Sequence, residues 1–231
     1  MKILIVSDEE SPALWDTAAK DKLREYDLMI SCGDLKADYL SFLVTLARCP
    51  LLYVHGNHDT GYDREPPLGC DCIDGKIVEY NGIRILGLGG CRQYHPGQFQ
   101  YTEQEMRRRI RRLRFPLWRT RGVDLVVTHA CIAGVGDAAD PAHRGFEAFL
   151  PLLKKYKPKY WLHGHVHLRY GTDRTRIRTW GETTVINASE RYTLEIPEGV
   201  CKPRNKNRLL WRNGAPELPE ETLPVEGNSG W

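Results

Sequence analysis

Short runs of apolar residues recur along the chain, each three or four residues long. They are residues 3–6, 28–30, 51–54, 125–127 and 160–162. Continuous apolar runs of this length are typical of strands that are buried on both faces. The pattern therefore predicts buried strands at five places in the first 162 residues.

Stretches with helical spacing of apolar residues lie between these runs. They predict helices over residues 12–26, 37–48 and 145–156. Thr102 and Glu105 have the spacing of a capping box, and the helix that they open is expected to end before Pro116.

The second half of the chain is richer in strand patterns. Asn81-Gly82 between two alternating segments predicts a β-hairpin of residues 77–88, and residues 177–180, 183–188 and 192–196 predict further short strands. From Pro197 onward the apolar content falls. We therefore expect one domain over residues 1–196, followed by an irregular tail over residues 197–231. Pattern alone predicts an α/β fold and no finer class.

Composition excludes several classes of protein. Of 231 residues, 41% are hydrophobic and 27% are charged, which is typical of a globular domain. The net charge of +3 is too small to predict a nucleic-acid partner by itself. No apolar run is long enough to span a bilayer, and Met1 leads directly into a strand. Together with an odd number of cysteines, seven, this favours a cytoplasmic protein with reduced thiols and no membrane partner.

Residues that can bind metals follow the apolar runs. The segments are Asp8-Glu9-Glu10, Gly33-Asp34, Gly56-Asn57-His58-Asp59, Thr128-His129 and Gly164-His165-Val166-His167. The carboxyl ends of strands converge at one edge of an α/β sheet, so these segments are expected to meet there. Asp, Asn and His together suit a pair of divalent cations. Each segment alone would be typical of a turn, and only their ordered set predicts a site.

This ordered set of motifs resembles the calcineurin-like metallophosphoesterase family from about Lys2 to Leu194. The resemblance implies a four-layer α/β/β/α sandwich of two packed mixed sheets. It also implies a metal-dependent hydrolase of phosphomonoesters or phosphodiesters, in which a hydroxide bridging two metal ions attacks phosphorus. The substrate would be a small phosphoester. The two divalent ions would be Mn²⁺ first, with Mg²⁺, Fe or Zn²⁺ as alternatives.

The resemblance also implies a role for each residue of the motifs. Asp34 would bridge the two metals, with Asp8, Glu10 and His167 at the first and Asn57, His129 and His165 at the second. His58 would protonate the leaving group, and Asp59 would orient the His58 ring. His55 and His163, which flank the motifs among apolar neighbours, are expected to be core or supporting residues.

Glu10 departs from the family pattern, because the first motif is usually Asp-x-His. Residues i and i+2 at a strand end point to the same side, so Asp8 and Glu10 are both expected to face the metals. One more carboxylate would leave less positive charge for a dianionic monoester. This gives a weak preference for phosphodiesters.

Two groups of residues outside the motifs are candidates for binding a substrate. Arg92, His143 and Arg144 lie in predicted loops and could contact the phosphate. Eight arginines lie between Arg107 and Arg121. A nuclease could use them to bind a nucleic-acid backbone, but their helical spacing favours an ordinary solvated helix. We also see no alternation of aromatic and basic residues there that predicts stacking on bases.

A third possibility is a domain of this type that has become a non-catalytic protein-binding scaffold. Retention of His58 argues against it, since a scaffold has no chemical need for a proton donor. The pattern leaves the oligomeric state open.

Overall fold

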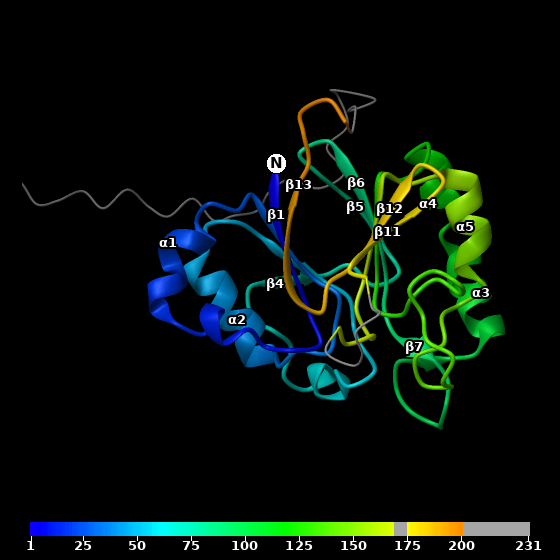
Figure 1. The fold of residues 1–231 in the computed structure, drawn as a ribbon, viewed down its shortest axis with the longest axis horizontal. Helices are drawn as coiled ribbons and strands as arrows, with labels where there is room; N and C mark the ends of the chain where they lie inside the picture. The colour runs from blue at the N-terminus through cyan, green and yellow to red at the C-terminus, as the bar shows by residue number, and fades with distance from the viewer. Residues whose placement is uncertain (169–174, 201–231) are drawn as a thin grey trace, which may run out of the picture.

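The chain folds into two mixed sheets with helices on both outer sides (Figure 1). The structure is a computed structural model, and it describes residues 1–168 and 175–200. The first sheet has the order β13-β1-β2-β3-β4, and the second has the order β11-β12-β10-β9-β6-β5. Within each sheet the inner strands are parallel, and antiparallel pairings occur at the edges. The strands of the first sheet are β1 (Lys2–Ser7), β2 (Leu28–Ser31), β3 (Leu51–Tyr53), β4 (Cys70–Cys72) and β13 (Glu190–Glu195).

The strands of the second sheet include the predicted hairpin. They are β5 (Ile77–Tyr80), β6 (Ile83–Leu88), β9 (Leu125–Thr128), β10 (Tyr160–His163), β11 (Ile177–Trp180) and β12 (Thr183–Asn187). A small separate ribbon pairs β7 (Cys91–Arg92) with β8 (Gln100–Tyr101). The hairpin turn at Asn81-Gly82 has positive φ at both residues, as a tight turn between twisted strands requires.

The helices form the two outer layers. They are α1 (Lys20–Leu23) and α2 (Ala37–Leu46) beside the first sheet, and α3 (Glu103–Arg112), α4 (Arg114–Arg119) and α5 (Phe149–Tyr156) beside the second (Figure 1). Three 3₁₀ turns, Pro12–Leu14, Thr17–Ala19 and Thr60–Asp63, complete the elements of the described ranges.

Three apolar clusters hold the four layers together. Ile3 and Ile5 of β1 point between the sheets, where they pack with residues such as Val127 of the second sheet. Leu4 and Val6 of the same strand point to the helices α1 and α2. Both faces of β1 are thus buried, which is why its sequence is continuously apolar.

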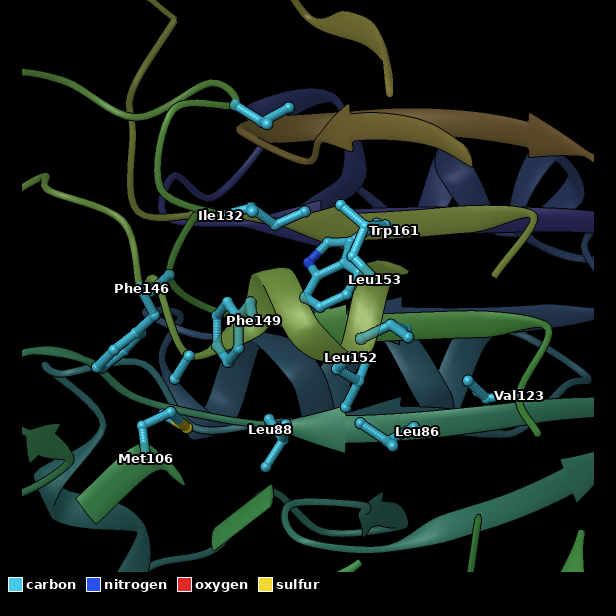
Figure 2. Packing of buried hydrophobic residues seen from close by; sticks show 14 of the residues in the cluster. Leu86, Leu88, Met106, Val123, Ile132, Phe146, Phe149, Leu152, Leu153 and Trp161 are labelled. Carbon is cyan, nitrogen blue, oxygen red and sulfur yellow. The ribbon is translucent and has the colours of Figure 1, made fainter. Parts of the chain in front are cut away.

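The third cluster lies between the second sheet and α3 to α5. Phe149, Leu152 and Leu153 of α5 pack against Trp161 of β10, with Met106 of α3 nearby (Figure 2). Each fully buried apolar side chain of this kind stabilises the fold by about 1.5–3 kcal/mol. The predicted four-layer sandwich is confirmed.

The predicted helix over residues 12–26 is wrong. The segment forms two 3₁₀ turns and the single helical turn α1. The helical structure is interrupted at Asp16, whose carboxylate accepts a hydrogen bond from the Ala18 amide at 2.9 Å. A short polar side chain that binds the backbone locally competes with a continuous helix.

The boundaries of two other helices also differ from the prediction. The helix expected from Gly145 begins only at Phe149, because Phe146 pairs with Ile132 in an isolated bridge. The capping box of Thr102 is confirmed, and α3 ends before Pro116. A second helix, α4, then continues through Pro116, which lies in its first turn, where a missing backbone N–H costs no hydrogen bond.

Two further observations bear on the composition. None of the six cysteines in the described ranges forms a disulfide. No helix in those ranges has the length and apolar character needed to cross a bilayer. Residues 201–231, which make up most of the predicted tail, lie outside the described residues.

Candidate metal centre

The five predicted motif segments meet where the carboxyl edges of the two sheets adjoin. Asp8 follows β1, Asp34 follows β2, His129 follows β9 and His165 follows β10. Asp8, Asp34 and His165 all have positive φ, at 66°, 58° and 66°. Non-glycine residues seldom adopt this conformation, and strained residues of this kind cluster at functional sites.

The glycines of the motifs are explained by close backbone packing. A Cβ atom on Gly33 would lie 2.3 Å from the Gly56 nitrogen, and one on Gly56 would lie 2.0 Å from Oδ1 of Asp34. A Cβ atom on Gly164 would lie 2.0 Å from Oγ of Ser7. Only glycine lets these loops approach closely enough to bring their neighbours together.

Asp34, His129 and His165 form the centre of the site. One ligand atom from each can be chosen so that all lie within 4.8 Å of one another. The Nδ1–H of His129 donates to the Cys32 carbonyl at 2.8 Å, so its Nε2 faces Oδ2 of Asp34 at 3.2 Å and Oδ1 of Asn57 at 3.1 Å. Nε2–H of His165 donates to the Ala142 carbonyl at 2.6 Å, which leaves its Nδ1 as the ligand atom. Backbone carbonyls thus fix both rings for metal binding.

The ionisation of this centre follows from burial and charge. Burial lowers the pKa of His129, but the Asp34 carboxylate outweighs it and raises the pKa to about 9. Burial raises the pKa of Asp34, but the charge and hydrogen bond of His129 bring it down to about 2. For His165, burial and the neighbouring His129 lower the pKa to about 3. At neutral pH the centre without metal therefore holds an ionised Asp34 beside a protonated His129, with His165 neutral, and a metal ion would have to displace the His129 proton.

Asp8 has one oxygen that no group in the described ranges satisfies. Oδ1 accepts a hydrogen bond from the His165 amide at 2.8 Å, whereas Oδ2 is buried without a partner. Burial, together with the Asp34 charge, raises the pKa of Asp8. A buried carboxylate oxygen without a donor is costly, and a cation would satisfy it. The donor set of Asp, Asn and His therefore fits divalent metal ions.

The expectation from sequence is that Asp8 and Glu10 face the same side. In the structure, Glu10 contacts residues outside the motifs and Glu9 contacts a motif residue. Strand β1 ends at Ser7, and the positive φ of Asp8 breaks the alternation on which that expectation depends. The Glu10 carboxylate accepts from the Trp15 indole at 2.6 Å and lies 3.6 Å from Nζ of Lys36. It is Glu9 whose Oε1 lies 2.9 Å from Nδ1 of His167. Sequence reasoning missed Glu9, because strand alternation placed it on the opposite side.

The contact expected between Asp59 and the His58 ring is not seen among the described residues. The His58 side chain is 76% exposed, with its Nε2 4.0 Å from Oδ2 of Asp34. Oδ2 of Asp59 accepts the amides of Gly56 at 2.7 Å and Asp34 at 3.0 Å. Among the described residues, Asp59 makes no hydrogen bond to the His58 ring, so the orienting role expected for it is not seen. It fixes the loop instead, and burial raises its pKa to about 6.

A family model described as the calcineurin-like phosphoesterase superfamily domain matches residues 1–191. The chain belongs to this superfamily. It is a family of metal-dependent phosphoesterases.

Two solved structures have the same fold. One crystal structure aligns with a TM-score of 0.61 at 14% sequence identity, covering 84% of this chain and 94% of its own. The crystal structure of TT1561 of Thermus thermophilus aligns with a TM-score of 0.54 at 16% identity, covering 82% of this chain and 89% of its own. At such identities the likeness establishes the fold alone. No curated protein matches the sequence.

The predicted substrate-binding residues lie at different distances from the superfamily motifs. His143 is close, since its ring centroid is 5.2 Å from that of His165, and Nδ1 lies 2.8 Å from Asp140. Arg92 is half-buried, and its nearest carboxylate, that of Glu103, is 4.0 Å away. Arg144 is exposed, and within the described ranges it has no ion pair. Of these three residues, His143 is the one with a contact to a motif residue among those that the structure describes.

The two flanking histidines have partners outside the centre. His163 is buried, with Nδ1 3.0 Å from the Gly164 carbonyl, and burial lowers its pKa to about 4. His55 stacks on Phe99 with ring centroids 4.3 Å apart, and its Nδ1 lies 3.7 Å from Asp74.

A cleft of about 670 Å³ opens beside Asp34 and His58. Its walls come from the loops after β1, β2 and β3 and from the start of α2 and the turn Thr60–Asp63. The lining residues are Asp8, Glu9, Glu10, Asp34, Leu35, Lys36, Ala37, Asp38, His58, Asp59, Gly61, Tyr62 and Glu65. A small organic phosphate fits a space of this size.

Proposed function

We propose that this protein hydrolyses small phosphoesters with the help of two divalent metal ions. The observation that carries the proposal is the unpartnered, buried Oδ2 of Asp8 beside the cluster of Asp34, His129 and His165. When bound, a pair of divalent ions neutralises developing charge on the phosphoryl oxygens and supplies hydroxide near neutral pH.

The ligand set that we propose differs from the family pattern at one place. Asp34 would be shared, and Asn57, His129 and His165 would hold the second ion. Asp8 and His167 would hold the first. Glu10 stays outside this set because Trp15 and Lys36 occupy its carboxylate. The Glu9 carboxylate accepts from Nδ1–H of His167, which would orient that ring and raise its basicity toward the first ion.

His58 is the residue that we propose to protonate the leaving group. Its exposed ring lies at the cleft, close to Asp34 but not bonded to it. A donor placed in this way can give a proton to an alkoxide as the phosphorus–oxygen bond breaks. The loop that carries His58 is held in place because its Gly56 amide donates to Asp59 and its His58 amide donates to Asp34. The Asp34 amide also donates to Asp59 and ties this loop to the loop after β2.

The charges around the cleft favour phosphodiesters over phosphomonoesters. Seven carboxylates line it, those of Asp8, Glu9, Glu10 and Asp34 among them, together with one lysine, Lys36. Their net negative charge would exceed the roughly four positive charges of two divalent ions, so little net attraction remains for a dianion. A diester carries one negative charge and is repelled less.

The test compares two chromogenic substrates that share a leaving group. The purified protein with Mn²⁺ is expected to turn over bis(p-nitrophenyl) phosphate with a higher kcat/KM than p-nitrophenyl phosphate. A higher value for the monoester would reverse the substrate preference. No turnover of either substrate with Mn²⁺, Mg²⁺, Zn²⁺ or Fe²⁺ would reject the enzyme and favour a scaffold.

A further inference from the structure

The outer face of α3 and α4 carries charge and aromatic rings that the proposed phosphoesterase site does not use. We define the arginine flank as the exposed residues of this face: Arg107, Arg108, Arg111, Arg112, Arg114, Phe115, Trp118 and Arg119. It lies on the outside of the second sheet (Figure 1), whereas the cleft is lined by loops of the first. The arginine flank is therefore separate from the proposed hydrolase site.

The arginines point outward because the other side of α3 is fixed in the core. Met106 and Leu113 are buried in the cluster beneath the helix. Arg109 also turns inward, where its Nη1 donates to the Gly89 carbonyl at 2.7 Å and its side chain pairs with Asp74. The remaining arginines of α3 lie at positions i, i+1, i+4 and i+5, which form one continuous outward surface.

This surface is not the mixed pattern of charges that stabilises an ordinary solvated helix. Arg107 faces Arg111 and Arg108 faces Arg112, and like charges at i and i+4 each destabilise a helix by about 0.2–0.5 kcal/mol. The sequence from Arg107 to Arg121 contains no acidic residue. Among the described residues, the four outward arginines of α3 have one carboxylate within 4 Å, that of Glu147, 3.9 Å from Arg107. The charge on this surface complements a polyanion.

Two exposed aromatic rings follow on the next helix, α4. Phe115 is 66% exposed and Trp118 is 73% exposed, with ring centroids 5.7 Å apart and planes tilted by 31°. The sequence shows no alternation of aromatic and basic residues that predicts stacking, but the fold leaves both of these rings exposed. Exposure of these two apolar rings to water is unfavourable. Neither ring packs in the cluster beneath the helix.

We propose that the arginine flank binds single-stranded nucleic acid. Guanidinium groups bind phosphates through paired N–H donors, and exposed aromatic rings provide faces on which bases stack. An anionic membrane surface fits less well. The apolar side of α3 is buried in the protein, so the outward side of this helix offers arginines and no apolar stripe. An acidic protein would use the charges but has no bases for Phe115 and Trp118.

The experiment measures binding of a fluorescein-labelled single-stranded dodecamer of thymidylate to the full chain, by anisotropy at several salt concentrations. Changing Arg111→Ala and Arg112→Ala together is expected to weaken binding and to reduce the slope of log K against log salt by about 1.4, about 0.7 for each lost phosphate contact. The matched control, Lys22→Ala with Arg24→Ala on and beside α1, removes the same charge from exposed residues elsewhere. It should change neither quantity.

A second variant tests the aromatic part. Trp118→Ala is expected to weaken binding by about 5- to 150-fold with the salt slope unchanged, the range for losing one stacked base. Trp118→Tyr should restore most of it, and unchanged thermal unfolding would confirm that both variants fold. The proposal is overturned if the oligonucleotide does not bind, or if the arginine pair and the control pair weaken binding equally. It is also overturned if polyglutamate competes as well as the oligonucleotide, or if only vesicles containing phosphatidylserine bind.

Discussion

At the scale of single residues, the centre depends on which nitrogen of each histidine is held by a hydrogen bond to a neighbouring group. Backbone carbonyls accept a hydrogen bond from one ring nitrogen of His129 and one of His165. The Glu9 carboxylate accepts from one ring nitrogen of His167. In His129 and His165 the other nitrogen is then the candidate ligand atom. Such partners commonly account for 10- to 100-fold in metal affinity.

Replacing the two glutamates separately distinguishes their roles. Glu9→Gln is expected to weaken binding of one Mn²⁺ by about 10- to 100-fold, because His167 loses the carboxylate that orients it. Glu10→Gln keeps the size of the side chain and should change affinity much less, since its partners are Trp15 and Lys36. Isothermal titration of the metal-free protein measures both. The opposite result, with metal lost only in Glu10→Gln, would assign Glu10 as the ligand.

His58→Ala is expected to leave the metal content intact and to lower turnover. General acid catalysis contributes about 10²- to 10⁴-fold, so the loss should be of this size for an alkyl leaving group. It should be much smaller for nitrophenolate, which needs no proton to leave. An equal loss with both leaving groups would show that His58 does not act as the acid.

At the scale of elements, loops and helix faces place the functional residues. The loop after β3 passes so close to Asp34 that only glycine fits at position 56, although position 61 in the same loop is open. Helix α3 likewise has one arginine directed inward and four outward. The two glycines of the loop differ in their structural role, and so do the arginines of the helix. Substituting one residue of each kind therefore distinguishes the two roles.

Gly56→Ala is expected to destabilise the protein by about 1–3 kcal/mol and to displace Asp34, because the new methyl group would lie 2.0 Å from Oδ1 of that residue. Gly61→Ala meets nothing within 4 Å, so it should be neutral or slightly stabilising. Urea unfolding of both variants measures the difference. Equal stabilities would mean that the loop can move away without cost.

Arg109→Ala is expected to cost about 3 kcal/mol of the free energy of unfolding. It would leave the Asp74 carboxylate buried without its main partner, although the Gly89 amide and His55 still contact that residue. Arg108→Ala on the exposed side should change stability by about 0.5 kcal/mol or less. Denaturant unfolding tests this pair, and similar losses for both would contradict the buried role of Arg109.

At the scale of the whole molecule, two sheets meet at an edge where buried carboxylates repel one another. Asp8 and Asp34 come from the first sheet, and His129 and His165 come from the second. A cation that binds there joins the two sheets and removes this repulsion. Metal binding should therefore be visible in the stability of the entire fold.

Mn²⁺ at about 100 times its dissociation constant is expected to stabilise the protein by about 2.7 kcal/mol, and EDTA should reverse the effect. Asp34→Asn should abolish this gain, because the shared ligand loses its charge. Asp38→Asn, an exposed acid of the same cleft, should retain it. Unfolding by urea with and without metal provides the measurement. Equal stabilisation of both variants would place the ion elsewhere.

The sequence by itself determined the strands other than the short β4, β7 and β8, the order of the motifs and the edge where they meet. Strands buried on both faces must be continuously apolar, and their ligand residues must follow at their ends, so both features can be read from local pattern. The capping box of Thr102 and the hairpin at Asn81-Gly82 were predictable for the same reason, since each depends on a few neighbouring residues.

Tertiary structure alone decided where side chains point once the regular elements end. The left-handed backbone of Asp8 exchanged the sides of Glu9 and Glu10. The Asp59 carboxylate accepts hydrogen bonds from the amides of Gly56 and Asp34, which are distant from each other in sequence. Packing of α3 and α4 on the second sheet left Phe115 and Trp118 exposed. Each outcome depends on contacts between residues far apart in the chain, and local periodicity carries no information about such contacts.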